Sequence, residues 1–324
     1  MRNPIFNETN LSPRTVLWIS ILTLVMGVVL FPACKKTRVQ SQTTTTGAGY
    51  TNATAFHSNY QQQEQTFTVD SPGTGPIIGK LGTKFYPWDS IFMYPTGQNV
   101  YYPFTLKVFE IYGVKDIILS SLPTVGGGHI LESKAAIRAR TFKGATELVL
   151  KHGKRFPMET ASVPNILSGM SVWYGFNTSG FNDWTNAVYT LDPSIGNPDV
   201  LSSVTQLTST YAMDIARMGW VDCARLYANT TNMTSVTFTA SGTNPQNIEV
   251  YLVFNTSASV MQVYNLHSGQ IPVGTNCTVV AFAMDQNNSL VYDKQNITVT
   301  AGMTVTLNPV ATSDANLLAV LGAL

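Results

Sequence analysis

Hydrophobic and polar positions alternate in short runs from Thr66 onward, and turn residues separate the runs. Helical 3.6-residue periodicity is missing from the first half of this region, so the pattern predicts strands throughout it. Two tandem β-sandwiches, Ig-like or transthyretin-like, over residues 66–205 and 206–312, explain the pattern best, and the predicted fold class is all-β. The clearest runs are 102–112, 116–122, 131–142, 146–150, 171–176, 184–190, 211–216, 235–240, 248–254, 260–266, 278–284, 296–300 and 304–307.

Two local features depart from simple alternation. Alternation is strict from Phe104 to Val108, and it slips by one position through Phe109, Glu110 and Ile111, which predicts a β-bulge. At the end of the chain, Ser313 and Asp314 precede an apolar stretch and form a good N-cap. Residues 313–324 are therefore expected to form a short helix that packs on the second sandwich.

The first 33 residues have the pattern of a bacterial lipoprotein signal peptide. Arg2 and Arg14 form a basic n-region, an uncharged apolar run follows over 16–30, and Ala33 stands directly before Cys34. The run is short for a membrane span. We expect lipidation at Cys34, with diacylglyceryl and acyl (palmitate) chains anchoring the protein in the outer membrane. The alternatives are an uncleaved anchor and a plain secretory signal in which Cys34 is incidental.

Residues 34–65 lose hydrophobic periodicity and are rich in Thr, Gln, Asn and Gly. This composition predicts a disordered tether with a reach of about 30 Å. The basic residues Lys35, Lys36 and Arg38 after the cysteine favour the periplasmic face over the cell surface.

The composition is that of an exported β protein. Charged residues make up 11% of the chain, against roughly 25% in ordinary soluble domains. The chain carries 19 Lys and Arg against 18 Asp and Glu, so no basic excess directs it to nucleic acid.

Apart from Cys34, the chain has two cysteines, Cys223 and Cys277. Each lies in an apolar stretch with strand character. The two residues can form one disulfide in an oxidising compartment or stay as buried thiols, and the sequence leaves both alternatives open.

Catalytic and metal-binding patterns are sparse. The four histidines, at 57, 129, 152 and 267, stand apart and show no ligand spacing, so no metal site is expected. The glycine-rich segments lack the residues of phosphate-binding loops, and no serine stands in a nucleophile elbow. We therefore expect no cofactor and no enzymatic activity. The alternative is an enzyme that uses the aspartates between the predicted domains, at 183, 192, 199, 214 and 222.

Aromatic residues give the strongest indication of binding. Trp173, Trp184 and Tyr189 lie in a segment rich in Gly, Asn and Ser, and such rings either stack on sugars or fill the core. An earlier aromatic cluster over 85–103 is interrupted by prolines, which favours edge or loop positions that expose rings.

Several short elements resemble a known family. The stretch from Phe104 to Pro157 contains Leu106-Lys107-Val108-Phe109-Glu110-Ile111-Tyr112, Leu122-Pro123-Thr124, Leu131-Glu132-Ser133 and Ala139-Arg140-Thr141. With the later segment 218–226, it is similar to uncharacterised lipoproteins from Bacteroidetes-type bacteria. The resemblance extends over about 77–226. It implies a first domain like the β-sandwich of ankyrins and netrin receptors, which is a scaffolding module. Segments 271–274 and 298–305 resemble transthyretin-like domains.

The sequence thus predicts a non-enzymatic, lipid-anchored envelope protein that acts as a scaffold or interaction module, with an unidentified envelope protein or glycan as partner. The alternative is a cell-surface protein that binds glycans for adhesion or capture.

Overall fold

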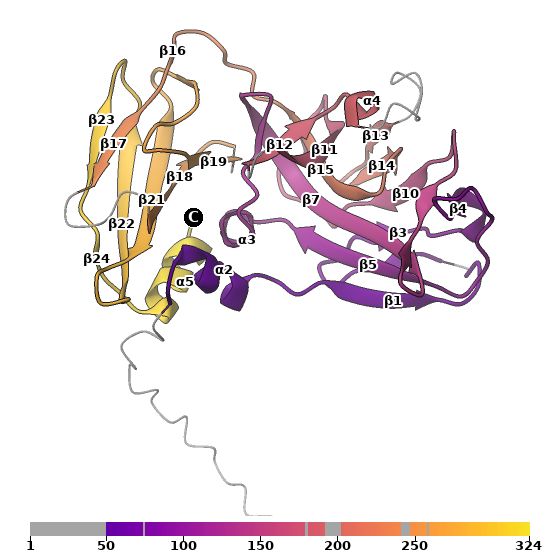
Figure 1. The fold of residues 1–324 in the computed structure, drawn as a ribbon. Coiled ribbons are helices and arrows are strands. Elements are labelled where there is room, and N and C mark those ends of the chain that lie inside the picture. The colour runs from indigo at the N-terminus through magenta and orange to yellow at the C-terminus, as the bar shows by residue number, and fades with distance from the viewer. Residues whose placement is uncertain (1–49, 74, 179–180, 192–201, 241–246, 258) are drawn as a thin grey trace, which may run out of the picture. The chain divides into compact units, whose positions relative to one another are not determined.

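The computed structural model describes residues 50–73, 75–178, 181–191, 202–240, 247–257 and 259–324. Most of the elements are strands, and a short helix ends the chain (Figure 1), so the predicted all-β fold class is confirmed. The predicted signal peptide and Cys34 lie outside these residues.

The first β-sandwich is built from two antiparallel sheets. The first sheet has the order β1 (Gln65–Val69), β5 (Phe104–Ile111), β7 (His129–Lys143), β15 (Gly219–Leu226), β11 (Ser171–Thr178) and β12 (Phe181–Thr185). The small strands β6 (Val125–Gly126) and β8 (Thr146–Glu147) also pair with β7. The second sheet has the order β13 (Ser203–Gln206), β14 (Tyr211–Ile215), β10 (Phe156–Glu159), β3 (Lys84–Phe85) and β2 (Ile77–Ile78). Strands β4 (Phe92–Met93) and β9 (Val149–Leu150) form a separate pair.

Alternating side chains of both sheets form one core. Leu106, Val108 and Ile137 of the first sheet are buried with Phe156 and Tyr211 of the second sheet. Strands have a side-chain period of two, so the residues between these positions lie on the opposite, outer face of the first sheet.

The predicted domain boundary after residue 205 is wrong. It divides the hairpin in which β13 pairs with β14, and it separates β15 from its partners β7 and β11. All three strands belong to the first sandwich, because their apolar residues, such as Met213 and Val221, are buried in its core. The second β region therefore begins after Leu226.

The second β region has a third sheet with the order β19 (Ser259–Val263), β18 (Ile248–Phe254), β21 (Asn276–Met284), β22 (Leu290–Thr298) and β24 (Val310–Ala311). Two short pairs accompany it: β17 (Thr237–Ala240) runs parallel to β23 (Thr304–Leu307), and β16 (Met233–Thr234) pairs with β20 (Ile271–Pro272). Leu252, Val279 and Phe238 are buried together in the core of this region.

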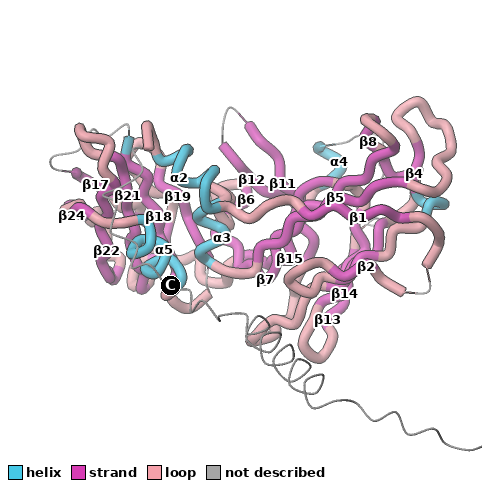
Figure 2. The backbone as a smooth tube through the Cα atoms, turned by 90° about the horizontal axis from the view of Figure 1, so that it is seen from below, coloured by secondary structure: helices cyan, strands magenta, loops and turns pink. Residues whose placement is uncertain are grey.

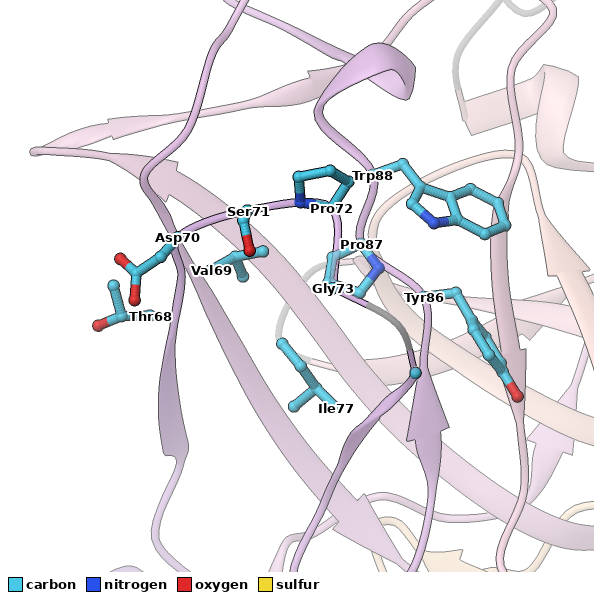
Figure 3. A pocket seen from close by; sticks show the side chains of 11 residues that line it. Thr68, Val69, Asp70, Ser71, Pro72, Gly73, Ile77, Tyr86, Pro87 and Trp88 are labelled. Carbon is cyan, nitrogen blue, oxygen red and sulfur yellow. The ribbon is translucent and has the colours of Figure 1, made fainter.

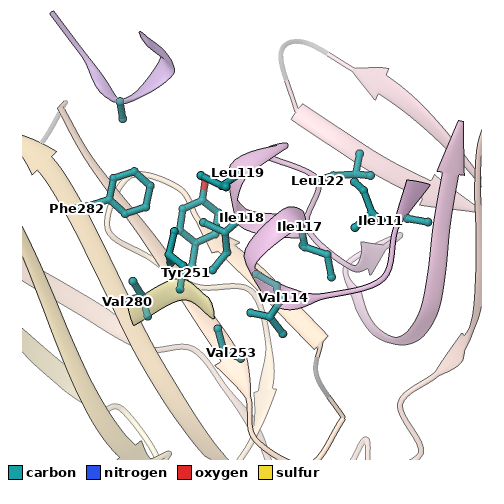
Figure 4. Packing of buried hydrophobic residues seen from close by; sticks show 14 of the residues in the cluster. Ile111, Val114, Ile117, Ile118, Leu119, Leu122, Tyr251, Val253, Val280 and Phe282 are labelled. Carbon is teal, nitrogen blue, oxygen red and sulfur yellow. The ribbon is translucent and has the colours of Figure 1, made fainter. Parts of the chain in front are cut away.

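Helices cover the outer face of the third sheet. Helices α2 (Ala53–Tyr60), α3 (Val114–Leu119) and α5 (Asp314–Gly322) contribute to one apolar cluster with Tyr251 and Phe282. Figure 4 shows the side chains of α3 between Ile111 of β5 and the rings of Tyr251 and Phe282. The hydroxyl of Ser313 accepts a hydrogen bond from Asn316 N at 3.2 Å, as expected of the N-cap.

The predicted tether over 34–65 includes folded structure at its C-terminal end. Asn52 caps α2, with its Oδ1 accepting from Ala55 N at 2.9 Å, and Phe56 is fully buried against Phe282. The prediction failed because the buried ring of Phe56 holds this helix in place, and the polar residues around Phe56 leave no hydrophobic periodicity in the sequence.

Two further predictions in the region 104–122 are wrong. Residues 116–122, expected to be a strand, include the C-terminal part of α3. The expected bulge is also missing: β5 pairs with β7 without a shift from Thr105 to Ile111. The apolar pattern slips because the end of β5 is buried on both faces, by the sandwich core and by α3.

Among the described residues, no helix has both the length and the apolar character needed to cross a membrane.

A buried ion pair holds α2 on the third sheet. His57 Nε2 lies 2.7 Å from Glu249 Oε2, and Nδ1 lies 3.1 Å from the carbonyl oxygen of Leu119. Both neighbouring atoms are acceptors, so the geometry fits a protonated imidazole that donates from both nitrogens. The Tyr251 hydroxyl also donates to Glu249 Oε2 at 2.7 Å.

We expect Glu249→Gln to lower the free energy of unfolding by about 2 kcal/mol at pH 7. Burial raises the pKa of Glu249, but the hydrogen bond and charge of His57 and the Tyr251 hydroxyl outweigh burial and lower it. A carboxyl with a lowered folded-state pKa stabilises the fold above its unfolded value of about 4.3, and this contribution is lost as pH falls further. Urea unfolding across pH should therefore show the two proteins converging below about pH 4. A constant difference across pH would contradict the pair's role.

Candidate functional site

A groove of about 350 Å³ lies on the outer face of the first sheet, over β7, β15, β11 and β12. β7, β15 and the β11–β12 hairpin are neighbours in the sheet, although they come from three separate parts of the sequence (Figure 2). We call this feature the arginine groove. It is lined by Leu122, Arg138, Arg140, Gly175, Phe176, Asn177, Asn182, Asp183, Arg217, Gly219 and Trp220.

Two of its arginines come from β7. Ile137, which precedes Arg138, and Ala139, which separates the two arginines, point into the sandwich core. The two-residue period of the strand therefore sends both Arg138 and Arg140 to the outer face. The fold thus places both arginine side chains on the same face of the sheet without any special turn.

Arg138 is held by an acid and two aromatic rings. Its Nη2 donates to Glu64 Oε1 at 3.1 Å. The guanidinium carbon lies 5.2 Å from the centre of the Trp220 ring and 5.7 Å from that of Phe109. Trp220 is the cross-strand partner of Arg138, so the stacking follows from the register. The buried Nε of Arg138 has no hydrogen-bond partner among the described residues.

Arg140 has a similar environment. Its guanidinium carbon lies 4.8 Å from the centre of the Phe142 ring, and its Nε lies 3.5 Å from Glu147 Oε1. That separation makes an ion pair without a hydrogen bond, and the buried Nε lacks a hydrogen-bond partner in the part of the chain that the structure describes. Two guanidinium groups thus keep an unused donor each, which is costly unless a ligand or water accepts it.

Arg217 precedes a tight turn into β15. Gly219 has a φ of +120°, a conformation that residues with a side chain rarely adopt, so the turn depends on this glycine. No ion pair involves Arg217 within the described ranges. Arg217 therefore brings a positive charge to the groove without a carboxylate to balance it.

Polar side chains from the β11–β12 hairpin line the groove beside the arginines. Asn177 Nδ2 donates to Asn182 Oδ1 at 3.2 Å, and Asn182 Nδ2 donates to the carbonyl oxygen of Ser121 at 2.7 Å. Asp183 Oδ1 accepts from Gly127 N at 2.9 Å and from Trp184 N at 2.8 Å. These bonds fix the amide and carboxylate groups in place.

Gly175 provides space at the floor of the groove. A Cβ atom there would lie 2.8 Å from Trp220 Cβ and 3.1 Å from the Trp184 ring. A side chain at this position would push Trp220 out of its stack with Arg138.

The groove can bind a negatively charged ligand that also has hydroxyl groups. Three arginines and one carboxylate line the groove. Arg138 and Arg140 are each paired with a glutamate outside the lining, so Arg217 carries the charge that no ion pair among the described residues balances. Arginine binds carboxylates through paired hydrogen bonds, and the asparagines and Asp183 can bind hydroxyls. Phe176 and Trp220 are half-buried and also line the groove, where an aromatic side chain can contact a sugar ring.

Of the two interpretations of the aromatic segment, sugar stacking or core packing, Trp173 and Trp184 follow the second. Trp173 and Trp184 are buried, with exposed fractions of 6% and 1%. Trp173 Nε1 donates to the carbonyl oxygen of Ala224 at 3.2 Å, and Trp184 Nε1 donates to that of Pro123 at 2.8 Å. They belong to the core because α3 and the turn after it cover them. The Tyr189 side chain lies outside the described residues.

Sequence reasoning missed the residues that make the groove. Arg138, Arg140 and Arg217 were not candidates. The segment 173–190 drew attention through its aromatic rings, and it supplies other lining residues of the groove. The signal for two of them is the Arg-Ala-Arg alternation on a strand, since both charges must leave the core face together.

Cys223 and Cys277 are free thiols, so the disulfide alternative is wrong. Cys223 is buried in the core of the first sandwich and Cys277 in that of the second β region, each fully enclosed. Burial raises the pKa of Cys277 to about 12, which makes this thiol unreactive.

The aspartates considered for catalysis lie in separate places. Asp183 lines the groove, Asp214 is on β14 of the second sheet, and Asp222 is fully buried. Asp192 and Asp199 lie outside the described residues. Among those that are described, no group of three or more His, Cys, Asp or Glu could hold a metal ion.

No protein-family model matches the chain, and no curated protein matches it. The chain is similar to a γ-CGTase from alkalophilic Bacillus clarkii, with 12% identity and a TM-score of 0.17. The match covers 75% of this chain and 40% of that one, so the chain corresponds to less than half of the neighbour's length.

This finding corrects the prediction that the protein is not an enzyme. The similar structure is described as a γ-CGTase, and the non-enzymatic assignment is withdrawn. At this TM-score the similarity assigns no activity to the chain.

Proposed function

We propose that this chain is a lipid-anchored envelope protein that binds acidic glycans in the arginine groove. The observation that carries the proposal is the placement of Arg138, Arg140 and Arg217 around one groove with a single lining carboxylate. An acidic sugar has the matching chemistry, because it combines a carboxylate, a ring and hydroxyl groups.

The anchoring part of the proposal rests on the sequence. The apolar run over 16–30 followed by Ala33 and Cys34 supports lipidation in the outer membrane, on the periplasmic or the outer face. Membership of the Bacteroidetes-type lipoprotein family belongs to the same proposal. The scaffold role expected from that resemblance stays a prediction.

The geometry supports tight orientation of a carboxylate. Trp220 and Phe109 fix the Arg138 guanidinium by stacking, and Glu64 fixes its far end. A guanidinium that is already ordered loses little entropy on binding, so more of the interaction energy appears as affinity.

We expect Arg217→Ala to weaken the binding of pentagalacturonate about tenfold, which corresponds to about 1.4 kcal/mol for one charge-assisted contact. The measurement is calorimetric titration of the full chain in detergent. Arg155→Ala is the matched control, because it removes the same charge from a residue that does not line the groove. Arg217→Lys should recover part of the affinity, since lysine keeps the charge without the planar fork.

Equal affinities for the wild type and Arg217→Ala would remove Arg217 from the site. Equal losses in Arg217→Ala and Arg155→Ala would show that only the overall charge matters, and the assignment of the groove would fail.

A further inference from the structure

A second hollow, separate from the arginine groove, lies on the outer face of the third sheet. It has a volume of about 340 Å³ and shares no lining residue with the groove. We call it the Lys294 pocket. Residues of β18, β21 and β22 form its floor, and it is also lined by Val114 of α3 and by Ala323 and Leu324, which follow α5.

The strand register brings polar residues together on the floor of this pocket. Cys277 of β21 and Ile297 of β22 pack in the core on the inner side of the sheet. The two-residue period of the strands therefore turns their neighbours, Thr278 and Asn296, to the outer face. Thr278 and Asn296 are also cross-strand partners, so their side chains lie side by side.

Thr278 fixes two amide groups. Its Oγ1 lies 3.0 Å from Asn255 Oδ1 and 2.9 Å from Asn296 Oδ1, and one hydroxyl proton is shared between these oxygens. An amide group is planar, so its nitrogen points away from the side on which its oxygen is held. The two Nδ2 groups therefore face away from Thr278, and neither has a hydrogen-bond partner among the described residues.

Lys294 adds a positive charge beside these amides. It stands two residues before Asn296 on β22, about 7 Å away along the same face of the strand. Its side chain is exposed, and its ammonium makes no ion pair within the part of the chain that the structure describes. No aspartate or glutamate side chain lines the pocket. The donors of one lysine and two asparagines thus share a hollow that has no carboxylate side chain to accept from them.

One side of the pocket is apolar. Val114 at the start of α3 and Val253 of β18 are 7% and 4% exposed, and Figure 4 shows them close to each other. An alkyl chain that lies against these residues is removed from water, which strengthens binding about fourfold for each buried methylene.

The hollow beside the turn after β1 lacks such convergence. Figure 3 shows the Asp70 carboxylate and the Trp88 indole at its opposite ends, with Pro72 and Pro87 between them. A single sugar ring therefore cannot contact both groups.

We propose that the Lys294 pocket binds a monocarboxylate with an apolar chain, of the size of a short fatty acid. The Lys294 ammonium and the two amide nitrogens donate to the carboxylate, which has only acceptor sites, and the chain lies against Val114 and Val253. A volume of about 340 Å³ is within the range of small-molecule sites. The inference goes beyond the proposed function and does not depend on it.

The test is titration of the full chain in detergent with hexanoate, followed by saturation-transfer NMR. We expect saturable binding that Lys294→Gln weakens about tenfold or more. Lys294→Arg should keep most of the affinity because it keeps the charge. Lys80→Gln is the matched control, since it removes the same charge from an exposed lysine that does not line the pocket. Partition of hexanoate into the micelles is the same for all variants and cancels in the comparison.

Hexanamide keeps the chain without the charge, so we expect it to bind at least about tenfold more weakly than hexanoate. Absence of hexanoate binding would overturn the proposal, as would equal binding of hexanoate and hexanamide or of hexanoate by Lys294→Gln and the wild type. Binding of inorganic phosphate as tight as that of hexanoate would assign the pocket to a small anion without an apolar chain instead. Pentagalacturonate binding by Lys294→Gln should stay at the wild-type level, which separates this site from the arginine groove.

Discussion

Replacement of Glu110 by alanine is expected to lower the free energy of unfolding by about 3–5 kcal/mol. Glu110 is fully buried at the end of β5, and its carboxylate accepts three hydrogen bonds. The donors are Gln65 Nε2 at 2.7 Å, Leu81 N at 3.1 Å and Thr83 N at 3.0 Å. Alanine would leave these donors without an acceptor and would open a cavity, and each effect destabilises the sandwich.

Urea unfolding measures this effect, and Glu110→Gln is the matched variant. Glutamine keeps the volume and one acceptor oxygen, so its loss should be smaller, about 1–2 kcal/mol. Gly79→Ala should act on the same contact, because a Cβ there would lie 2.4 Å from Glu110 Oε2. A loss below about 0.5 kcal/mol for Glu110→Ala would contradict the role of this carboxylate.

Asp222→Asn is expected to abolish a stability loss that the wild type shows between about pH 4 and pH 7. Asp222 is fully buried, and burial raises its pKa to about 7, against a hydrogen bond from Ser133 that lowers it. The folded protein thus holds a proton that the unfolded chain releases near pH 4. The contribution of Asp222 to the free energy of unfolding is therefore fully present below about pH 4, and it is lost as pH rises from about 4 to about 7.

The expected size follows from the shift. About three pH units at about 1.4 kcal/mol each give on the order of 4 kcal/mol for the relative change between pH 4 and pH 8. Urea unfolding of the wild type, Asp222→Asn and the exposed control Asp70→Asn at both values tests it. Parallel pH profiles for the wild type and Asp222→Asn would show that Asp222 is ionised in the fold throughout.

Elements that are marked by a few neighbouring residues could be predicted from the sequence. Alternation from Phe104 to Val108 and the cap at Ser313 each depend on a few neighbouring residues, and the structure has both. Helix α3 was missed because it has six residues, of which Val114, Ile117, Ile118 and Leu119 are buried on several sides. Such a short, apolar helix shows no amphipathic period.

The domain boundary depended on pairing that no local pattern shows. β15 inserts between β7 and β11, so a strand from after residue 218 completes a sheet begun by β1. The spacing between strand-like segments does not indicate which strands pair in the sheet. The predicted boundary after residue 205 therefore followed the turns in the sequence and not the pairing.

In the candidate site, too, local patterns could be predicted and strand pairing could not. Alternation around Arg138 and Arg140 could have indicated an exposed basic face of one strand. Arg217, Trp220 and Asn182 join it only through the order of β7, β15, β11 and β12. Trp173 and Trp184 lie in a segment whose composition suits stacking on sugars. They are core residues because α3 and the turn after it pack over them.

The central claim is that the arginine groove recognises a carboxylate on a sugar. The most direct test compares pentagalacturonate with its carboxyl-reduced form, which keeps ring and length, by titration into the full chain at low and at physiological salt. We expect saturable binding of the acidic form that weakens as salt rises, because exposed charges are screened over about 8 Å at 0.15 M, and much weaker binding of the reduced form. Equal affinity for both forms, or no binding of the acidic one, would contradict the account.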